Sequence, residues 1–506
     1  MSRPTQRAVR RPLPPMLTGA ARRTQSGLEP WLPSSGDPFN ARRAAHLLRR
    51  AVFLPAWSDV RTAVAQGLDA TIDALFDTPP DPLSPGAWAE DIVDRPVTQE
   101  EKNAYDARNM TLCDALRGWW ANVMATSGPT IQERMVFFWS GHITSESREV
   151  RVPQLLYTQN QLFRAYALGN FRSLMKLVNH DAAMLRYLGG DINTGGNPNE
   201  NYARELMELY TMGEGHYTEQ DIKEAARCLT GWRLDEFTSL EPVFNPMYHD
   251  TGNKTFMGRT VVGRSSLDGR FEGDEIVDII FEREEVALFL CRKLYLAFVY
   301  NNPAAVDGDI VRGLADVFRA NNYEIRPVIE TLLRSAHFFD DVNVGAMIKN
   351  PAVYEAGMVR QFGANPGGTQ LQKDMTSLEQ ELINPPTVQG WEDYRTWIST
   401  TTYPLRKNYA LRFVTGQMPG GGTQLPMDVV AWAKEIDGHT DADTLIDNIL
   451  TLLLPRPVST TRRELYLNAM LGNAPVYEWN IDAPAAAVNL RAMLTRVTEA
   501  PDFQQH

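Results

Sequence analysis

The stretch at residues 197–222 holds the densest group of polar side chains in the sequence. At about 100° per residue, a helix through it places Asn201, Glu205 and Glu208 in one narrow stripe and its apolar residues on the opposite side. Two carboxylates three residues apart can act as a general acid and base or as metal ligands. The alternative is a solvated helix face with an Arg204–Glu208 ion pair, which contributes only about 0.2–0.5 kcal/mol.

A loop rich in glycine and asparagine, at residues 189–199, leads into this helix. Such loops favour tight turns and can bring backbone donors close to a ligand. Glu200 and Arg204 lie next to the carboxylate stripe, so we expect them to contact the same substrate.

Residues 243–263 are predicted to form a β-hairpin, with two extended runs around a turn at residues 251–253. His249 and Asp250 precede this turn and Lys254 follows it. Adjacent strand residues point to opposite faces, so at most one of His249 and Asp250 faces a site. In one interpretation Lys254 pairs with Asp250 across the turn. In the other, the hairpin is a flap that brings His249 to the carboxylate helix, with Lys254 binding the substrate.

Histidines and tryptophans supply the remaining candidates. His142 follows Phe138 and Trp139 at spacings of four and three residues, so it extends the apolar face of its helix. An inward histidine there is either a core residue or a ligand or proton carrier. Trp139, Trp232 and Trp391 could stack on a sugar ring or a base, unless they are buried at the ends of helices.

The elements that position these groups are predicted to be helical. Thr218 and Asp221 form an approximate capping box at the start of the helix that follows the carboxylates. Further helical periodicity is found at residues 99–126, 129–143, 153–168, 170–179, 273–281, 284–300, 308–319 and 325–336. We therefore expect an all-α fold with a small β-hairpin insertion. Its predicted parts are a disordered basic arm (1–38), a main helical domain (39–350) and a C-terminal helical region packed on it (351–506).

Composition excludes several classes of protein. The net charge of −12 argues against a nucleic-acid-binding protein, and no run of about 18 apolar residues predicts a membrane span. The three cysteines lie far apart, which argues against a disulfide framework. The chain contains no Walker loop, no G-x-G-x-x-G motif, no H-E-x-x-H motif and no G-x-S-x-G motif, which excludes the commonest nucleotide-binding, zinc-protease and α/β-hydrolase chemistries.

Several stretches occur together and in order along the chain. They are "ARRAAHLLRRAVF", "FFWSGHI", "NPNENYARELMELYTMGEGHYTEQDIKEAARCLTGW", "YHDTGNKTFMG", "IKNPAVY", "NPPTVQGWEDYRTWI" and "APDFQQH". From about residue 39 onward the chain resembles the bacterial family catalogued as domain of unknown function 1800. The resemblance implies that these segments belong together, and it supplies no activity. It also implies export, whereas residues 1–28 lack the apolar core of a secretory signal, which predicts a cytoplasmic protein.

We expect a hydrolase that acts on a polysaccharide or glycoconjugate through helix-borne carboxylates. One alternative is a divalent-metal-dependent enzyme with histidine and glutamate ligands, and another is a non-catalytic scaffold or binding protein with a buried polar network. The expected catalytic residues are His142, Glu205, Glu208 and His249. The expected substrate-binding residues are Trp139, Glu200, Asn201, Arg204, Trp232, Asp250 and Lys254.

Overall fold

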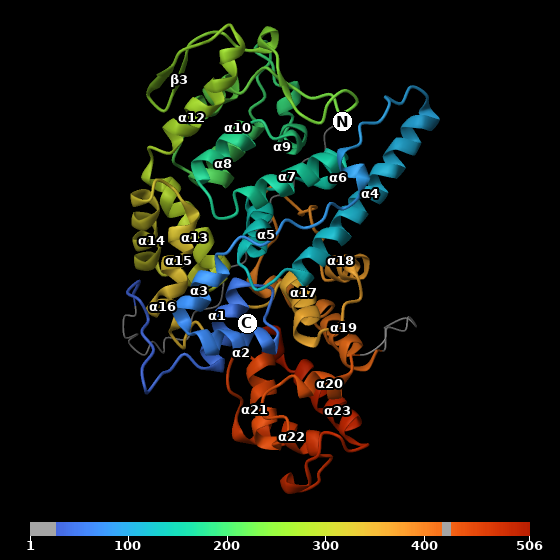
Figure 1. The fold of residues 1–506 in the computed structure, drawn as a ribbon. Helices are drawn as coiled ribbons and strands as arrows, with labels where there is room; N and C mark the ends of the chain where they lie inside the picture. Colours follow the sequence, from blue (N-terminus) through green and yellow to red (C-terminus); the bar gives the residue numbers. More distant parts are fainter. Residues whose placement is uncertain (1–26, 417–426) are drawn as a thin grey trace.

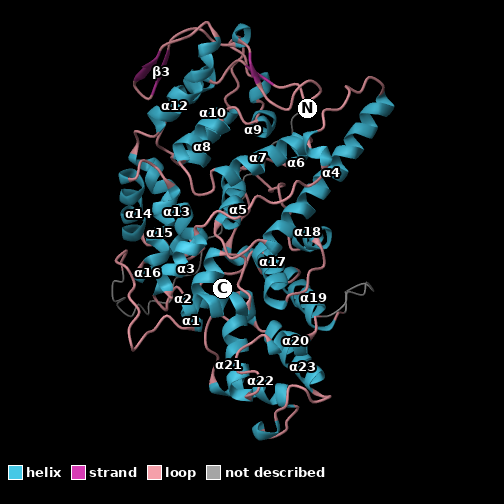
Figure 2. Cartoon of the chain, viewed as in Figure 1, coloured by secondary structure: helices cyan, strands magenta, loops and turns pink. Residues whose placement is uncertain are grey.

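The computed structural model describes residues 27–416 and 427–506, and helices dominate both ranges (Figures 1 and 2). Two short antiparallel strand pairs are the β-structure of these residues. The prediction of an all-α fold with a small β insertion is therefore confirmed. Within the described residues, no helix is both long enough and apolar enough to cross a bilayer.

The first half of the chain forms eleven helices among the described residues, and their starts follow local capping rules. Asn40 accepts hydrogen bonds from the backbone N–H groups of Arg42 and Arg43, and Asp181 accepts one from Met184. The helices are α1 (Ala41–Ala51), α2 (Trp57–Gln66), α3 (Leu68–Leu75), α4 (Gln99–Thr126), α5 (Gln132–His142), α6 (Ser147–Val150), α7 (Pro153–Ala165), α8 (Phe171–Val178), α9 (Ala182–Tyr187), α10 (Asn201–Glu205) and α11 (Glu219–Cys228).

The second half of the described chain contributes the remaining helices. Those from α17 onward belong to the predicted C-terminal region, and α17 and α18 pack against α4. The helices are α12 (Glu272–Ile280), α13 (Glu284–Phe298), α14 (Gly308–Ala320), α15 (Ile325–Arg334), α16 (Ala336–Phe339), α17 (Pro351–Phe362), α18 (Gly368–Ser377), α19 (Thr402–Thr415), α20 (Val429–Lys434), α21 (Ala442–Leu453), α22 (Thr460–Leu471) and α23 (Ala486–Thr498).

Core side chains from both predicted parts of the chain form one hydrophobic cluster. An ion-pair network reinforces the contact among α17, α18 and α19, where Arg412 pairs with Glu355 and Asp374 in the interior. The division at residue 350 stays a prediction, with the two parts sharing a continuous core.

The carboxylate helix departs from the regular geometry that its sequence predicts. After α10 the chain continues as a π-helical segment, Leu206–Thr211, in which turns are closed by bonds between residues five apart. The backbone N–H of Met212, for example, donates to the carbonyl oxygen of Met207 at 2.9 Å. Such segments are rare and frequently occur at functional sites.

The predicted hairpin at residues 243–263 is divided between two strand pairs. Its first extended run pairs with residues 232–233, because the chain returns there after a loop. The hairpin turn lies at Met257 and Gly258, both with positive φ, rather than at residues 251–253. The pairs are β1 (Trp232–Arg233) with β2 (Val243–Phe244), and β3 (Lys254–Phe256) with β4 (Arg259–Val261).

Residues 27–38, which the sequence assigns to a disordered arm, instead pack on α15 and α16. The backbone N–H of Trp31 donates to the carbonyl oxygen of Arg334 at 2.8 Å. The Trp31 ring stacks on Phe339 with 4.5 Å between ring centroids, so burial of aromatic surface fixes this segment. The rest of the predicted arm, residues 1–26, lies outside the described residues.

Candidate functional site

The predicted carboxylate stripe is a partly exposed acidic pair beside a tyrosine. Glu205 is half-buried, and burial followed by the nearby charge of Glu208 raises the pKa of its carboxyl group. The Tyr217 hydroxyl donates to Glu208 Oε2 at 2.5 Å. The Arg204–Glu208 pair of the solvated-face alternative does not form, because Arg204 binds Glu219 through two bonds of 2.9 and 2.8 Å. At the helix start Asn201 is exposed and Glu200 is partly exposed.

The hairpin positions a cluster of buried charges. Lys254 Nζ donates to Glu272 Oε2 at 2.5 Å, and His249 Nε2 lies 3.1 Å from Glu272 Oε1. All three side chains have no exposed surface. Burial raises the pKa of Glu272, but the bonds from His249 and Lys254 outweigh it and hold the pKa below its ordinary value. The other ring nitrogen of His249 lies 2.9 Å from the carbonyl oxygen of Thr230.

Asp250 belongs to a neighbouring network at the surface of the hairpin. Arg227 donates to both of its carboxylate oxygens, at 2.7 and 3.1 Å. Lys254 Nζ donates to the Asp250 carbonyl oxygen and lies 3.9 Å from Oδ1, so Glu272 rather than Asp250 is its main partner. The structure therefore places His249, Asp250 and Lys254 in a mutually paired network of the kind that the scaffold alternative describes.

The two tryptophans expected to bind substrate differ in exposure. Trp139 is completely buried; its Nε1 donates to the Ala167 carbonyl oxygen at 3.1 Å, and its ring stacks on Phe171. No face of Trp139 is open to a ligand. Trp232 is partly exposed and stacks on His180 with 4.9 Å between ring centroids.

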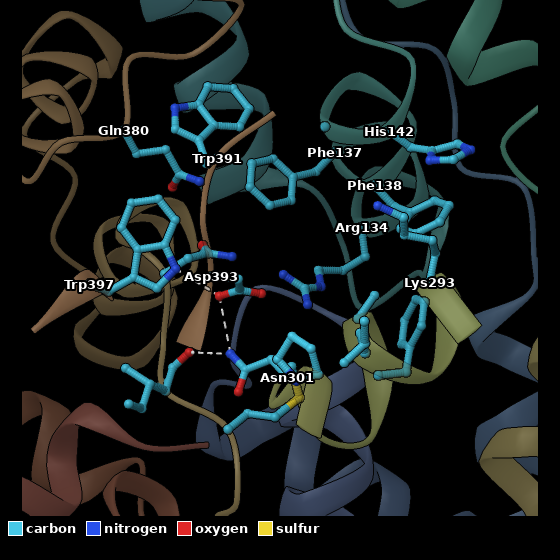
Figure 3. Close-up of a pocket in the computed structure, with 18 of the residues that line it drawn as sticks. Arg134, Phe137, Phe138, His142, Lys293, Asn301, Gln380, Trp391, Asp393 and Trp397 are labelled. Carbon is cyan, nitrogen blue, oxygen red and sulfur yellow. Dashed lines mark hydrogen bonds between the residues drawn. The ribbon is translucent and has the colours of Figure 1, made fainter. Parts of the chain in front are cut away.

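A cavity of about 210 Å³ lies where α5, α13 and the loop at residues 380–397 meet (Figure 3). Four stretches that are far apart in the sequence contribute to its wall: "FFWSGHI", "IKNPAVY", "NPPTVQGWEDYRTWI" and "APDFQQH". Aromatic and aliphatic side chains form most of this wall. They include Phe137, Phe138, Phe298, Ile348, Trp391 and Trp397.

Arg134 extends from α5 into this cavity (Figure 3) and is only 6% exposed. Its Nε and Nη1 atoms are buried without a hydrogen-bond acceptor among the described residues. Burial lowers the pKa of the guanidinium to about 10, while the negative charge of Asp393 opposes the shift. Arg134 is therefore charged at neutral pH, with two buried nitrogen atoms that have no acceptor among the described residues.

Asp393 lies across the cavity from Arg134, and one of its carboxylate oxygens is held firmly (Figure 3). Oδ1 accepts from Trp397 Nε1 at 2.7 Å, from the Tyr394 backbone N–H at 2.7 Å and from Asn301 Nδ2 at 3.1 Å. Oδ2 accepts no hydrogen bond from the described residues. Although Asp393 is open to solvent from the cavity, the dense protein around it raises the pKa of its carboxyl group.

The backbone around Asp393 is strained and closely packed. Tyr394 has a φ of 66°, a left-handed conformation that costs a bulky residue about 1–3 kcal/mol. Gly390 has a φ of 88°, and a Cβ atom there would lie 2.6 Å from the carbonyl oxygen of Gly141 in α5. The loop therefore lies directly against α5, which fixes where Trp391 and Asp393 enter the cavity.

His142 connects the cavity wall to the π-helical segment. Its Nε2 lies 2.9 Å from the carbonyl oxygen of Tyr210, whereas Nδ1 is buried without a partner. Burial, together with the charge of Lys293, lowers the pKa of His142 to about 3, so the ring is neutral at physiological pH. The ring points away from the space between Arg134 and Asp393 (Figure 3).

Of the four predicted catalytic residues, the cavity wall contains His142 and not Glu205, Glu208 or His249. Sequence reasoning missed Arg134 and Asp393, although a signal for both was present. Arg134 precedes Phe137 and Phe138 at helical spacing, which places a cation on an apolar face. Asp393 and Trp397 belong to one of the stretches that carry the family resemblance.

The predicted divalent metal has no recognisable position in the part of the chain that is described. No group of three or more histidine, cysteine, aspartate or glutamate side chains there has the arrangement of a metal site. The metal-dependent alternative stays a prediction from the sequence.

The fold and the cavity define a multi-helical protein with a small, aromatic-walled, solvent-accessible cavity between a buried arginine and an aspartate. The chain belongs to the family described as Protein of unknown function (DUF1800), which matches residues 46–505. No curated protein and no solved structure matches it.

Proposed function

We propose that this protein binds a small organic anion in the central cavity, with Arg134 binding its carboxylate or phosphate group. The observation that carries the proposal is that two buried guanidinium atoms of Arg134, Nε and Nη1, have no acceptor among the described residues. A buried charge is costly unless a partner compensates it, and almost all buried charges in proteins are paired. A bound anion would supply the partner that the described residues do not.

The cavity's size and walls support a small ligand with an apolar body. Its volume of about 210 Å³ is below the roughly 300–1,000 Å³ of pockets that hold drug-sized molecules. Trp391, Phe137 and Trp397 offer ring faces or edges to an aromatic or aliphatic group (Figure 3). Lys293 adds a second cation to the wall, so this region attracts anions even though the whole chain carries a net charge of −12.

The test is a calorimetric titration with two anions and a neutral relative. The anions are 3-phenylpropionate and phenyl phosphate, and the neutral compound is 3-phenylpropionamide. We expect an anion to bind and the amide not to bind. Arg134→Gln should weaken anion binding by roughly 30-fold or more, because truncating a buried charge partner costs about 2–5 kcal/mol. Arg496→Gln changes an exposed arginine in α23 and is the matched control. Equal binding of anion and amide, or no binding at millimolar concentration, would overturn the proposal.

A second candidate function, hydrolysis of a polysaccharide or glycoconjugate, uses the pair Glu205 and Glu208. It is supported by the raised pKa of Glu205, because two carboxyl groups with different environments can divide the roles of acid and base. A glycan-panel screen tests it with wild-type protein, Glu205→Gln and Glu208→Gln. Hydrolysis that is lost in both variants but kept in the exposed control Asp77→Asn would support this function. An inactive wild-type protein across the panel would remove it.

A further inference from the structure

We infer that Asp393 is a second binding group of the cavity and that the ligand is a small acid with a hydroxyl or ammonium group next to its anionic end. The ligand class that fits is an α-hydroxy or α-amino acid with an apolar side chain. The inference rests on the proposed function, because it places the anionic end of the ligand on Arg134.

The first step is the unequal use of the two Asp393 oxygens. Three donors from Asn301, Tyr394 and Trp397 converge on Oδ1. They fix the carboxylate plane, so Oδ2 is presented to the cavity in one orientation. In its ionised form the carboxylate accepts hydrogen bonds and donates none, so Oδ2 in that form selects a ligand group that donates.

The second step is that Arg134 and Asp393 face the same cavity without contacting one another directly. The two groups face one another (Figure 3), and the charge of Asp393 acts on Arg134, yet no ion pair joins them in the described part of the chain. Both are held by rigid surroundings: Arg134 by α5 and the Phe53 ring 5.4 Å from its Cζ, and Asp393 by its three donors. A ligand between them therefore has to offer an acceptor to one side and a donor to the other.

The third step is selectivity. A ligand with an anionic group but no donor would displace solvent from Oδ2 and leave this oxygen without a partner, which weakens binding. Sites built to bind a polar group reject analogues that lack it for this reason. The apolar residues of the wall, Phe137 and Trp391 among them, then accommodate the side chain of the acid.

The experiment compares matched ligands that differ only at the carbon next to the carboxylate. They are 3-phenylpropionate without a donor, 3-phenyllactate with a hydroxyl group and phenylalanine with an ammonium group. We expect at least one of the two donor-bearing acids to bind about tenfold more tightly than 3-phenylpropionate, which corresponds to 1.4 kcal/mol. In Asp393→Asn this advantage should disappear while binding of 3-phenylpropionate is kept. The exposed substitution Asp77→Asn should retain the advantage.

The outcomes separate this inference from the proposed function. If 3-phenylpropionate binds through Arg134 and neither donor-bearing acid binds more tightly, the role of Asp393 is overturned and the anion site stands. If Asp393→Asn weakens all three acids equally, Asp393 supports the cavity structure only, and the inference fails. If no acid binds, or Arg134→Gln changes nothing, the proposed function fails as well.

Discussion

Two buried cationic side chains, Lys254 and Arg134, differ in whether the protein supplies a hydrogen-bond acceptor, and this difference indicates where a ligand binds. Lys254 is completely buried and donates to Glu272, so its charge is compensated within the fold. Arg134 is 6% exposed, and its Nε and Nη1 atoms have no acceptor among the described residues. The negative charge of Asp393 offsets part of the cost of burying this cation, but buried donors without an acceptor still destabilise the fold. Functional sites can retain such unfavourable groups.

His142 gives a prediction about stability at acidic pH. Its pKa is about 3 in the folded protein and about 6.5 in the unfolded chain, so the unfolded state takes up a proton first as pH falls. His142 therefore does not change the free energy of unfolding above about pH 6.5. Between about pH 6.5 and 3 it lowers that free energy progressively. By pH 4.5 the loss should reach about 2–3 kcal/mol.

Urea denaturation of wild-type protein and His142→Gln at pH 7 and pH 4.5 measures this effect. Glutamine can still donate to the Tyr210 carbonyl oxygen and does not titrate, so the variant should lose less stability between the two pH values. Equal losses in the two proteins would show that His142 is protonated in the folded state.

At the scale of secondary-structure elements, local sequence rules predict where helices start, whereas tertiary contacts determine the strand pairing. The capping box of Thr218 and Asp221 forms as expected, because both partners lie within four residues of one another. The strand pairing around residues 243–263 was wrong in register, since strands of two or three residues carry too little alternation to fix it. The π-helical segment was missed because its apolar pattern is that of an ordinary helix.

The contact between Gly390 and α5 gives a prediction at this scale. Gly390→Ala would place a methyl group against the Gly141 carbonyl oxygen and would also strain a positive φ. The loop should move away from α5 and carry Trp391 and Asp393 with it. We expect weaker binding of 3-phenyllactate by about tenfold, with circular dichroism showing unchanged helix content. Gly258→Ala, at a positive-φ turn with open space around it, controls for backbone strain alone. Equal binding in both variants and the wild type would show that the loop position does not matter.

At the scale of the whole molecule, the site exists because distant segments converge. The cavity wall combines α5, α13, the loop at residues 380–397 and His506. Each segment could be recognised in the sequence as part of a pattern, yet no spacing rule brings residue 134 to residue 393. The prediction that the carboxylate helix forms the site relied on the geometry within a single helix. Sequence periodicity is informative about that geometry and not about contacts between distant segments. The candidate site depends on tertiary packing, and that packing separates His142 from the other predicted catalytic residues.

The central claim is that Arg134 is present for a ligand rather than for the fold. Arg134→Met tests it most directly, because methionine keeps much of the side-chain length and removes the charge. The measurements are the free energy of unfolding without ligand and the affinity for 3-phenylpropionate. We expect the unliganded variant to be more stable than wild type by about 1 kcal/mol, since an unpaired buried charge is removed, and to have lost ligand binding. A variant that is less stable by a similar amount and binds the acid as the wild type does would contradict the account.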